Sequence, residues 1–138
     1  MMVSTRGRYA LRVMVDLAVN STTGFVPLSD VAGRQEISEK YLESIVSALA
    51  KNKLLDSTRG KGGGYKLNRP ASEYTVAEIL KATEGSMAPV ACLKDGADPC
   101  PRMENCSTLA MWKELYQLTD SFFSGISIQD LADGTKQI

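Results

Sequence analysis

Apolar residues follow a helical spacing near the start of the chain. The stripe at 9–18 predicts an amphipathic helix, and the Ser-Thr-Thr-Gly run at 21–24 predicts that this helix ends near Asn20. Pro27 then favours the start of a short second helix, because the first turn of a helix accommodates proline.

A third amphipathic helix is predicted after a short link at 35–37. Ser38 is a residue type favoured as the N-cap, and it is predicted to cap the start of this helix. The expected buried stripe consists of Tyr41, Leu42, Ile45, Val46 and Leu49. Two helices joined by so tight a link match a helix-turn-helix, in which the later helix reads DNA.

Two short strand-like runs follow, at 53–59 and 65–69, with a glycine-rich tip between them. Four of the five residues at 60–64 are glycine, so the backbone of the tip can adopt positive φ angles and approach a phosphate closely. Arg59 and Lys61 bring positive charge to this tip. A β-hairpin directly after a helix-turn-helix is predicted to be a wing.

The rest of the chain is predicted to contain a helix at 74–84, a long loop at 86–105 and a final helix at 107–123. The final helix has an apolar seam of Leu109, Trp112, Leu115, Tyr116, Phe122 and Phe123. A small head cannot cover so large a seam, which favours packing against the same helix of a second subunit. The alternative is that this helix folds back onto its own head.

Charge divides the chain into two halves, although its 16 Lys and Arg balance its 16 Asp and Glu. Residues 1–69 have eleven basic and six acidic side chains, a net charge of +5, and residues 70–138 have a net charge of −5. This asymmetry suggests that the first half binds a polyanion. No apolar run is long enough for a membrane span and no leader opens the chain, so we expect a soluble, cytoplasmic protein.

Three cysteines, Cys92, Cys100 and Cys106, lie on or next to the predicted loop, and the chain has no histidine. An odd number of thiols cannot close a set of disulfides. Three thiols on one flexible loop can converge on an iron–sulfur cluster or on zinc, and free reactive thiols are the third interpretation. Without histidine, a nucleophile–base pair or a phosphate cradle, an enzyme is not expected.

Double-stranded DNA is the polyanion that this arrangement favours. Arg59 on a thin hairpin can enter a minor groove, and Arg6 and Arg8 on the first helix can contact phosphates. The third helix presents on one polar face Lys40, Glu43, Ser44 and Ser47, of which Ser47 is expected to be solvated. Glu43 can accept a hydrogen bond from cytosine or exclude a wrong base. A plain solvated face is the alternative for these side chains.

Three segments resemble the Rrf-type family of bacterial winged-helix regulators, in the group that includes IscR and CymR. Their sequences are TRGRYAL at 5–11, ISEKYLE at 37–43 and RGKGGGY at 59–65. The cysteines, followed by Ala-Met-Trp at 110–112, are similar to the IscR branch. The resemblance implies a homodimer that binds operator DNA and represses genes for cluster assembly.

The resemblance also implies roles for individual residues. The three cysteines match the ligands of a two-iron, two-sulfur cluster, Glu43 matches a residue that discriminates between operator classes, and Arg59 matches a minor-groove contact. The expected DNA-contacting set is Arg6, Arg8, Ser38, Lys40, Tyr41, Glu43, Ser44, Arg59 and Lys61.

The chain departs from the IscR pattern at the fourth ligand, because Leu109 occupies the position of a histidine that lies three residues after the last cysteine. The carboxylates of Asp95, Asp98 and Glu104, a residue of the partner subunit and an exogenous group are the open alternatives.

The expected fold is mainly α with a small β-wing. A winged helix-turn-helix head occupies 1–70, and a cluster-binding loop and long dimerisation helix occupy 71–138. Two other functions remain open. One is a cluster-free regulator of sulfur metabolism that responds to thiols or to a protein partner, and the other is a zinc-binding interaction module.

Overall fold

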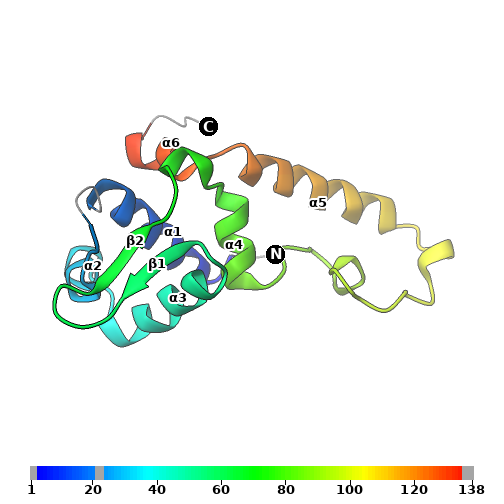
Figure 1. Ribbon diagram of the computed structural model, residues 1–138. Helices are drawn as coiled ribbons and strands as arrows, with labels where there is room; N and C mark the ends of the chain where they lie inside the picture. The colour runs from blue at the N-terminus through cyan, green and yellow to red at the C-terminus, as the bar shows by residue number, and fades with distance from the viewer. Residues whose placement is uncertain (1–2, 21–23, 135–138) are drawn as a thin grey trace.

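The chain folds into a head of packed helices with a small hairpin, from which one long helix projects (Figure 1). A computed structural model describes residues 3–20 and 24–134. The helices are α1 (Thr5–Asn20), α2 (Leu28–Gln35), α3 (Glu39–Lys51), α4 (Val76–Glu84), α5 (Leu109–Ser124) and α6 (Ile128–Asp133), and the strands are β1 (Leu55–Thr58) and β2 (Gly64–Leu67). The predicted mainly α fold with a β-wing is confirmed, and α1 ends at the predicted residue. Residues 21–23 of the run expected to end it lie outside the described residues.

The core is built around α1, which packs against α2, α3, α4 and α6. Met14 and Leu17 of α1 are fully buried and belong to one cluster with Leu42 and Ile45 of α3 and Ile79 of α4. Full burial of an aliphatic side chain of this size contributes roughly 1.5–3 kcal/mol. The head is therefore held together mainly through the inner face of α1.

The start of α3 agrees with the predicted cap. The Ser38 hydroxyl accepts a hydrogen bond from the Tyr41 amide at 3.2 Å. Four of the five predicted stripe residues are fully buried, but Tyr41, assigned to the stripe, is 37% exposed. Its ring packs edge-on against Tyr9, with the centroids 5.8 Å apart, which leaves one side of this amphipathic residue in water.

The wing is an antiparallel pair in which Leu55 faces Leu67 and Thr58 faces Gly64. A third segment joins it, because Val26 and Tyr65 exchange two backbone hydrogen bonds of 2.8 and 2.9 Å. Gly64 has a φ of +156°, and a Cβ there would lie 2.0 Å from the Val26 carbonyl oxygen. Glycine at this position therefore allows β2 to dock against the start of α2.

The wing is tied to α4 through Tyr74, which is fully buried. Its hydroxyl donates to the Leu54 carbonyl and accepts from the Asn68 amide, both at 2.9 Å. Burial raises the pKa of Tyr74, so the phenol keeps its proton. The helix expected from residue 74 begins at Val76, because Tyr74 has an extended backbone after a 3₁₀ turn at Ala71–Glu73.

The short helix α6 was not predicted from the sequence. Ser127 and Asp130 form a capping box with two hydrogen bonds of 3.0 Å. Ile128 is fully buried in the same cluster as the inner face of α1, so residues beyond 70 take part in the core of the head. The predicted division of the chain at residue 70 is not tested by this packing and stays a prediction.

The long helix α5 projects from the head (Figure 1), and the seam predicted on it is covered only in part within the chain. Tyr116 and Phe123 of α5 pack on a second small cluster of Val76, Leu80, Met87 and Ile126. The remaining length has no buried side chain within this single chain. In the described part of the chain, no helix combines the length and apolar content needed to cross a membrane.

Candidate nucleic-acid interface and cysteine loop

The outer face of α3 carries the polar side chains that the sequence analysis assigned to DNA contact. These exposed residues are Ser38 at the cap and Lys40, Tyr41, Glu43 and Ser44 on the helix. The opposite face is anchored in the core by Leu42, Ile45 and Leu49. A helix held in this way presents a rigid polar surface of the kind that fits a major groove.

The two arginines at the start of α1 have different surroundings. Arg6 is half-buried, and its Nη1 and Nη2 atoms donate to the hydroxyl and the carbonyl oxygen of Ser44 at 2.9 and 3.1 Å. Arg8 is exposed and donates to the Thr5 hydroxyl at 3.1 Å. Arg6 therefore braces α3, whereas Arg8 presents its guanidinium to solvent.

Arg59 and Lys61 lie on the loop between β1 and β2 and are both exposed. This loop is the tip of the wing, which lies beside α2 in Figure 1. Gly60 and Gly62 have φ angles of +89° and +80°, so the predicted positive φ angles are confirmed. The Gly63 amide donates to the Gly60 carbonyl at 2.9 Å and closes the turn. The hairpin therefore holds two cations on a narrow loop beyond its paired strands.

A buried carboxylate fixes α2 against α1. The Asp16 side chain is 1% exposed. Its carboxylate accepts hydrogen bonds from Nε and Nη2 of Arg34 at 3.0 and 2.7 Å and from the side-chain nitrogen Nε2 of Gln35 at 2.9 Å. The hydrogen bonds to Asp16 raise the pKa of Arg34. This group was not predicted from the sequence, although an aspartate between Val15 and Leu17 in an apolar stripe was a usable signal.

The cysteine loop, residues 85–108, contains two 3₁₀ turns at Ala91–Leu93 and Met103–Asn105. Cys92 and Cys100 are half-buried and Cys106 is exposed. A contact of 3.4 Å with the Thr108 hydroxyl lowers the pKa of the Cys106 thiol. Among the described residues, no three Cys, Asp or Glu side chains come together closely enough to hold a metal ion. The three cysteines as ligands of one cluster therefore stay a prediction.

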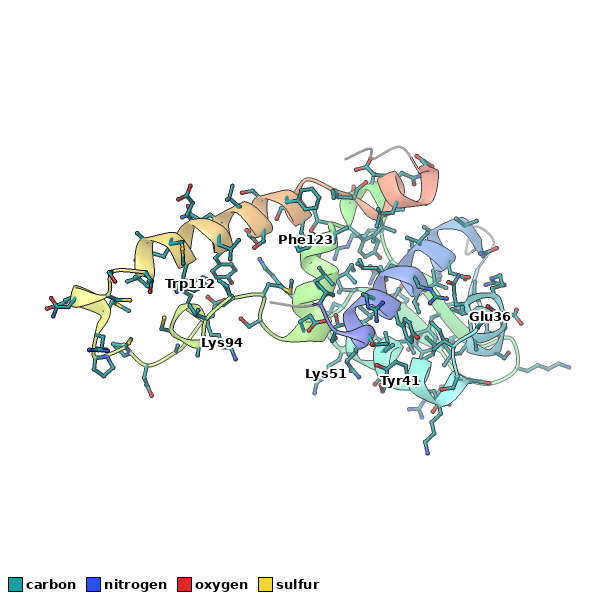
Figure 2. All side chains as sticks on the ribbon, turned by 180° about the vertical axis from the view of Figure 1, so that it is seen from behind. Glu36, Tyr41, Lys51, Lys94, Trp112 and Phe123 are labelled. Atoms are coloured by element: carbon teal, nitrogen blue, oxygen red, sulfur yellow. The ribbon has the colours of Figure 1, made fainter. Side chains whose placement is uncertain are left out.

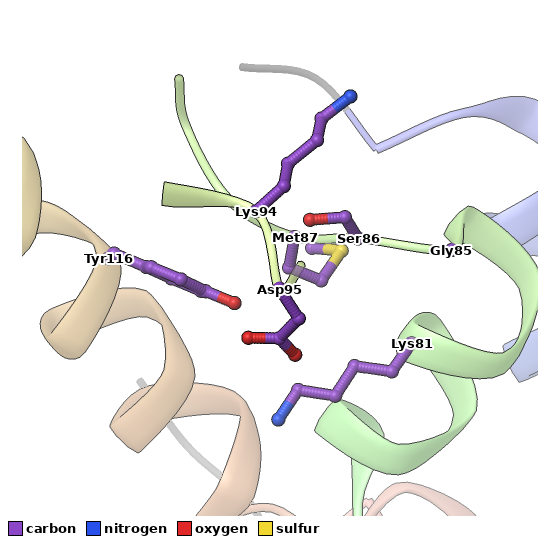
Figure 3. A pocket seen from close by; sticks show the side chains of 7 residues that line it. All are labelled: Lys81, Gly85, Ser86, Met87, Lys94, Asp95 and Tyr116. Atoms are coloured by element: carbon purple, nitrogen blue, oxygen red, sulfur yellow. The ribbon is translucent and has the colours of Figure 1, made fainter. Parts of the chain in front are cut away.

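The donor types on the loop nevertheless fit a thiolate-bound cluster. All three cysteines lie within 15 residues of a loop whose regular structure is limited to two short turns, so they can converge without unwinding a helix. Asp98 and Glu104 are exposed, and Leu109 is half-buried at the start of α5. The Asp95 carboxylate points toward Lys81 and Tyr116 (Figure 3).

A cavity of about 250 Å³ lies where the cysteine loop meets α4 and α5 (Figure 3). It is lined by Lys81, Gly85, Ser86, Met87, Lys94, Asp95 and Tyr116. Lys81 Nζ lies 2.9 Å from Asp120 Oδ1, and this hydrogen bond, helped by Tyr116 and Asp95, raises the pKa of Lys81. The junction is therefore a charged cluster, which the sequence analysis did not identify because its members belong to three separate elements.

The long helix α5 has two apolar sides. Trp112 lies on the side that faces the cysteine loop, and Phe123 lies where α5 meets α4 (Figure 2). The other side is formed by Met111, Leu118 and Phe122, which are 52%, 62% and 43% exposed. We call these three residues the outer stripe. Their spacing of seven and four residues places them along one line of the helix.

Comparison with known proteins identifies related sequences over nearly the whole chain. Residues 3–134 match the family Rrf2, described as iron-dependent transcriptional regulator. The HTH-type transcriptional regulator IscR of Photorhabdus laumondii is 41% identical over 133 residues, which cover 96% of this chain and 80% of that protein. IscR of Klebsiella pneumoniae strain 342 is 40% identical with the same coverage.

Solved structures of two related regulators match the whole fold. CymR of B. subtilis, described as the global cysteine regulator, has a TM-score of 0.77 at 31% identity, covering 99% of both chains. IscR of T. potens has a TM-score of 0.76 at 28% identity, covering 99% of this chain and 89% of that one. The names of these relatives indicate transcriptional regulation and not enzymatic activity.

Proposed function

The chain belongs to the Rrf2 family of DNA-binding transcriptional regulators, and on this premise we propose that it is a homodimeric repressor with a two-iron, two-sulfur cluster. One observation carries the proposal. An exposed polar helix with a cationic wing and a loop with three thiols are attached to the same small head. Such an arrangement can read DNA on one side and report the state of the loop from the other.

DNA recognition is assigned to α3 and the wing. With α3 in the major groove, Glu43 selects against bases that offer no hydrogen-bond donor, while Ser38, Lys40, Tyr41 and Ser44 contact base edges or phosphates. Arg59 enters the adjacent minor groove, where the negative potential is strongest. Exposed Lys61 and Arg8 contact phosphates on either side. Arg6 supports α3 through its two hydrogen bonds to Ser44.

The cluster is assigned to Cys92, Cys100 and Cys106, and the fourth ligand comes from the alternatives named above. When bound, a two-iron, two-sulfur cluster supplies a redox-active centre with thiolate ligands. The chain itself contributes a lowered pKa at Cys106, which favours the thiolate, and a loop that can bring the thiols together. Binding of the three thiols to one cluster would order the loop between α4 and α5. An ordered loop then favours one arrangement of the heads relative to α5.

The dimer is assigned to the outer stripe of α5, which shares only Phe122 with the seam predicted from the sequence. Met111, Leu118 and Phe122 are large apolar side chains exposed along one line of a helix that projects from its own head. A second copy of the same helix covers such a stripe symmetrically. Two heads held in this way match an operator with two-fold symmetry.

Oxygen-free purification followed by iron and sulfide analysis and an absorption spectrum tests the cluster. We expect about two irons and two sulfides per chain. Cys92→Ala should lose both, whereas Ser107→Ala, a matched change beside Cys106, should keep both. Colourless protein after reconstitution, or unchanged iron in Cys92→Ala, would contradict the assignment.

A cluster-free regulator is the second candidate, and the match to the cysteine regulator CymR favours it. In that case the three thiols act directly or through a protein partner. Metal-free protein whose operator binding changes on thiol oxidation would support this candidate. Metal-loaded protein whose binding depends on iron content would exclude it.

A further inference from the structure

Glu84, the last residue of α4, is bonded to the beginning of α1, 80 residues earlier in the chain. One of its oxygens, Oε1, accepts from the Ser4 amide at 2.9 Å and from the Ser4 hydroxyl at 2.5 Å. The Gly7 amide in turn donates to the Ser4 hydroxyl at 3.1 Å. A carboxylate at this end of a helix is also favoured by the free amides of the first turn.

The approach of Glu84 to α1 depends on a glycine. A Cβ at Gly7 would lie 2.3 Å from Glu84 Oε1, closer than atoms without a bond can come. Gly7 is buried in the first turn of α1, although glycine is unfavourable inside helices. A side chain at position 7 would therefore have to displace the Glu84 carboxylate from its present place.

The same turn of α1 also holds the DNA-reading helix. Arg6, next to Gly7, donates to the hydroxyl and the carbonyl oxygen of Ser44 on the exposed face of α3. The first turn of α1 is thus bonded on one side to the end of α4 and on the other side to the middle of α3. A path of contacts therefore runs from Glu84 through Ser4, Gly7 and Arg6 to Ser44, with a hydrogen bond at every step except the peptide bond between Arg6 and Gly7.

The cysteine loop begins directly after Glu84. Gly85 follows with a φ of +81° and ends α4, so the backbone that leaves Glu84 is the backbone that enters the loop. We propose that Glu84 is a positioning residue that sets α3 through the first turn of α1, and that it carries the state of the cysteine loop to the DNA-reading face. The second half of this inference rests on the proposed function, whereas the first half does not.

A comparison of Glu84→Ala with Glu84→Gln tests the inference in the oxygen-free full-length protein. Both variants remove the same charge, but glutamine keeps an acceptor for Ser4 and alanine does not. We expect Glu84→Ala to lower the ratio of operator to random-sequence affinity about 5- to 10-fold, the lower range of couplings between sites. Glu84→Gln should retain most of this ratio. The exposed carboxylate of Glu73 provides the control Glu73→Ala, which should leave the ratio unchanged.

Amide hydrogen exchange of the free protein supplies a readout that needs neither DNA nor cluster. Faster exchange in the first turn of α1 and around Ser44 of α3 is expected for Glu84→Ala, and near wild-type exchange for Glu84→Gln. Ser4→Ala removes the hydroxyl contact with Glu84 but keeps the amide contact, so it should remove part of the effect of a further Glu84→Ala change. Equal exchange and equal affinity ratios for the alanine and glutamine variants would overturn the inference.

The two proposals fail in different ways. If wild-type protein binds operator and random DNA equally, the proposed function fails, and the exchange data still decide whether Glu84 positions α3. If cluster-loaded and cluster-free wild type differ in operator affinity but Glu84→Ala retains that full difference, Glu84 does not carry the state of the loop.

Discussion

Truncation of Leu118 to alanine should weaken the dimer. Leu118 is the most exposed member of the outer stripe, at 62%. Full burial of a leucine side chain is worth about 2 kcal/mol, so covering the exposed part contributes about 1.2 kcal/mol per subunit. A two-fold interface contains the residue twice, and alanine removes most of its side chain from both copies. The dimer should therefore lose roughly 2 kcal/mol, which is about a 30-fold increase in its dissociation constant.

Sedimentation equilibrium over a range of protein concentrations measures this dissociation constant. Leu131→Ala on α6 is the matched control, because Leu131 is also exposed, at 37%, but lies outside the outer stripe. The control should dimerise as the wild type does. Equal dissociation constants for Leu118→Ala and the wild type would refute the assignment of the outer stripe to the subunit interface.

Three further changes test the head. Arg59→Ala should weaken operator binding about 5- to 100-fold and reduce the slope of log affinity against log salt concentration by about one. Fluorescence anisotropy measures both quantities, and an unchanged slope would contradict a wing contact with DNA. Gly64→Ala should destabilise the fold by about 1–3 kcal/mol in urea unfolding, because its Cβ would overlap the Val26 carbonyl, and full stability would contradict the docking of the wing. The pKa of Tyr74 is raised by burial, so the unfolded chain releases this proton first and stability falls as pH rises above about 10. Tyr74→Phe should be less stable at pH 7 but lose less stability between pH 9 and 11, and an identical pH slope in thermal unfolding would count against the buried phenol.

Local signals were sufficient to predict the DNA-reading part of the head. Ser38 followed by a regular apolar stripe located α3, and the glycine run between two short strands located the wing. These features depend on residues close together in the chain, whose preferences agree with the packing. Tyr41 shows the limit of such reasoning, because its exposure depends on the ring of Tyr9 from another helix.

Contacts between distant segments escaped the sequence analysis for a physical reason. Glu84 and Ser4 lie 80 residues apart, and neither residue is unusual in its own segment. The ion pair of Lys81 with Asp120 likewise depends on how α5 leaves α4. The helix α6 has six residues, too few to show a helical period before its docking on α1 is known.

Operator affinity of one protein preparation, measured by fluorescence anisotropy with the cluster bound and after its removal, tests the central claim most directly. We predict that the two dissociation constants differ by about fivefold or more on at least one operator. Identical dissociation constants on every operator, in a preparation whose iron content is shown to differ, would contradict it.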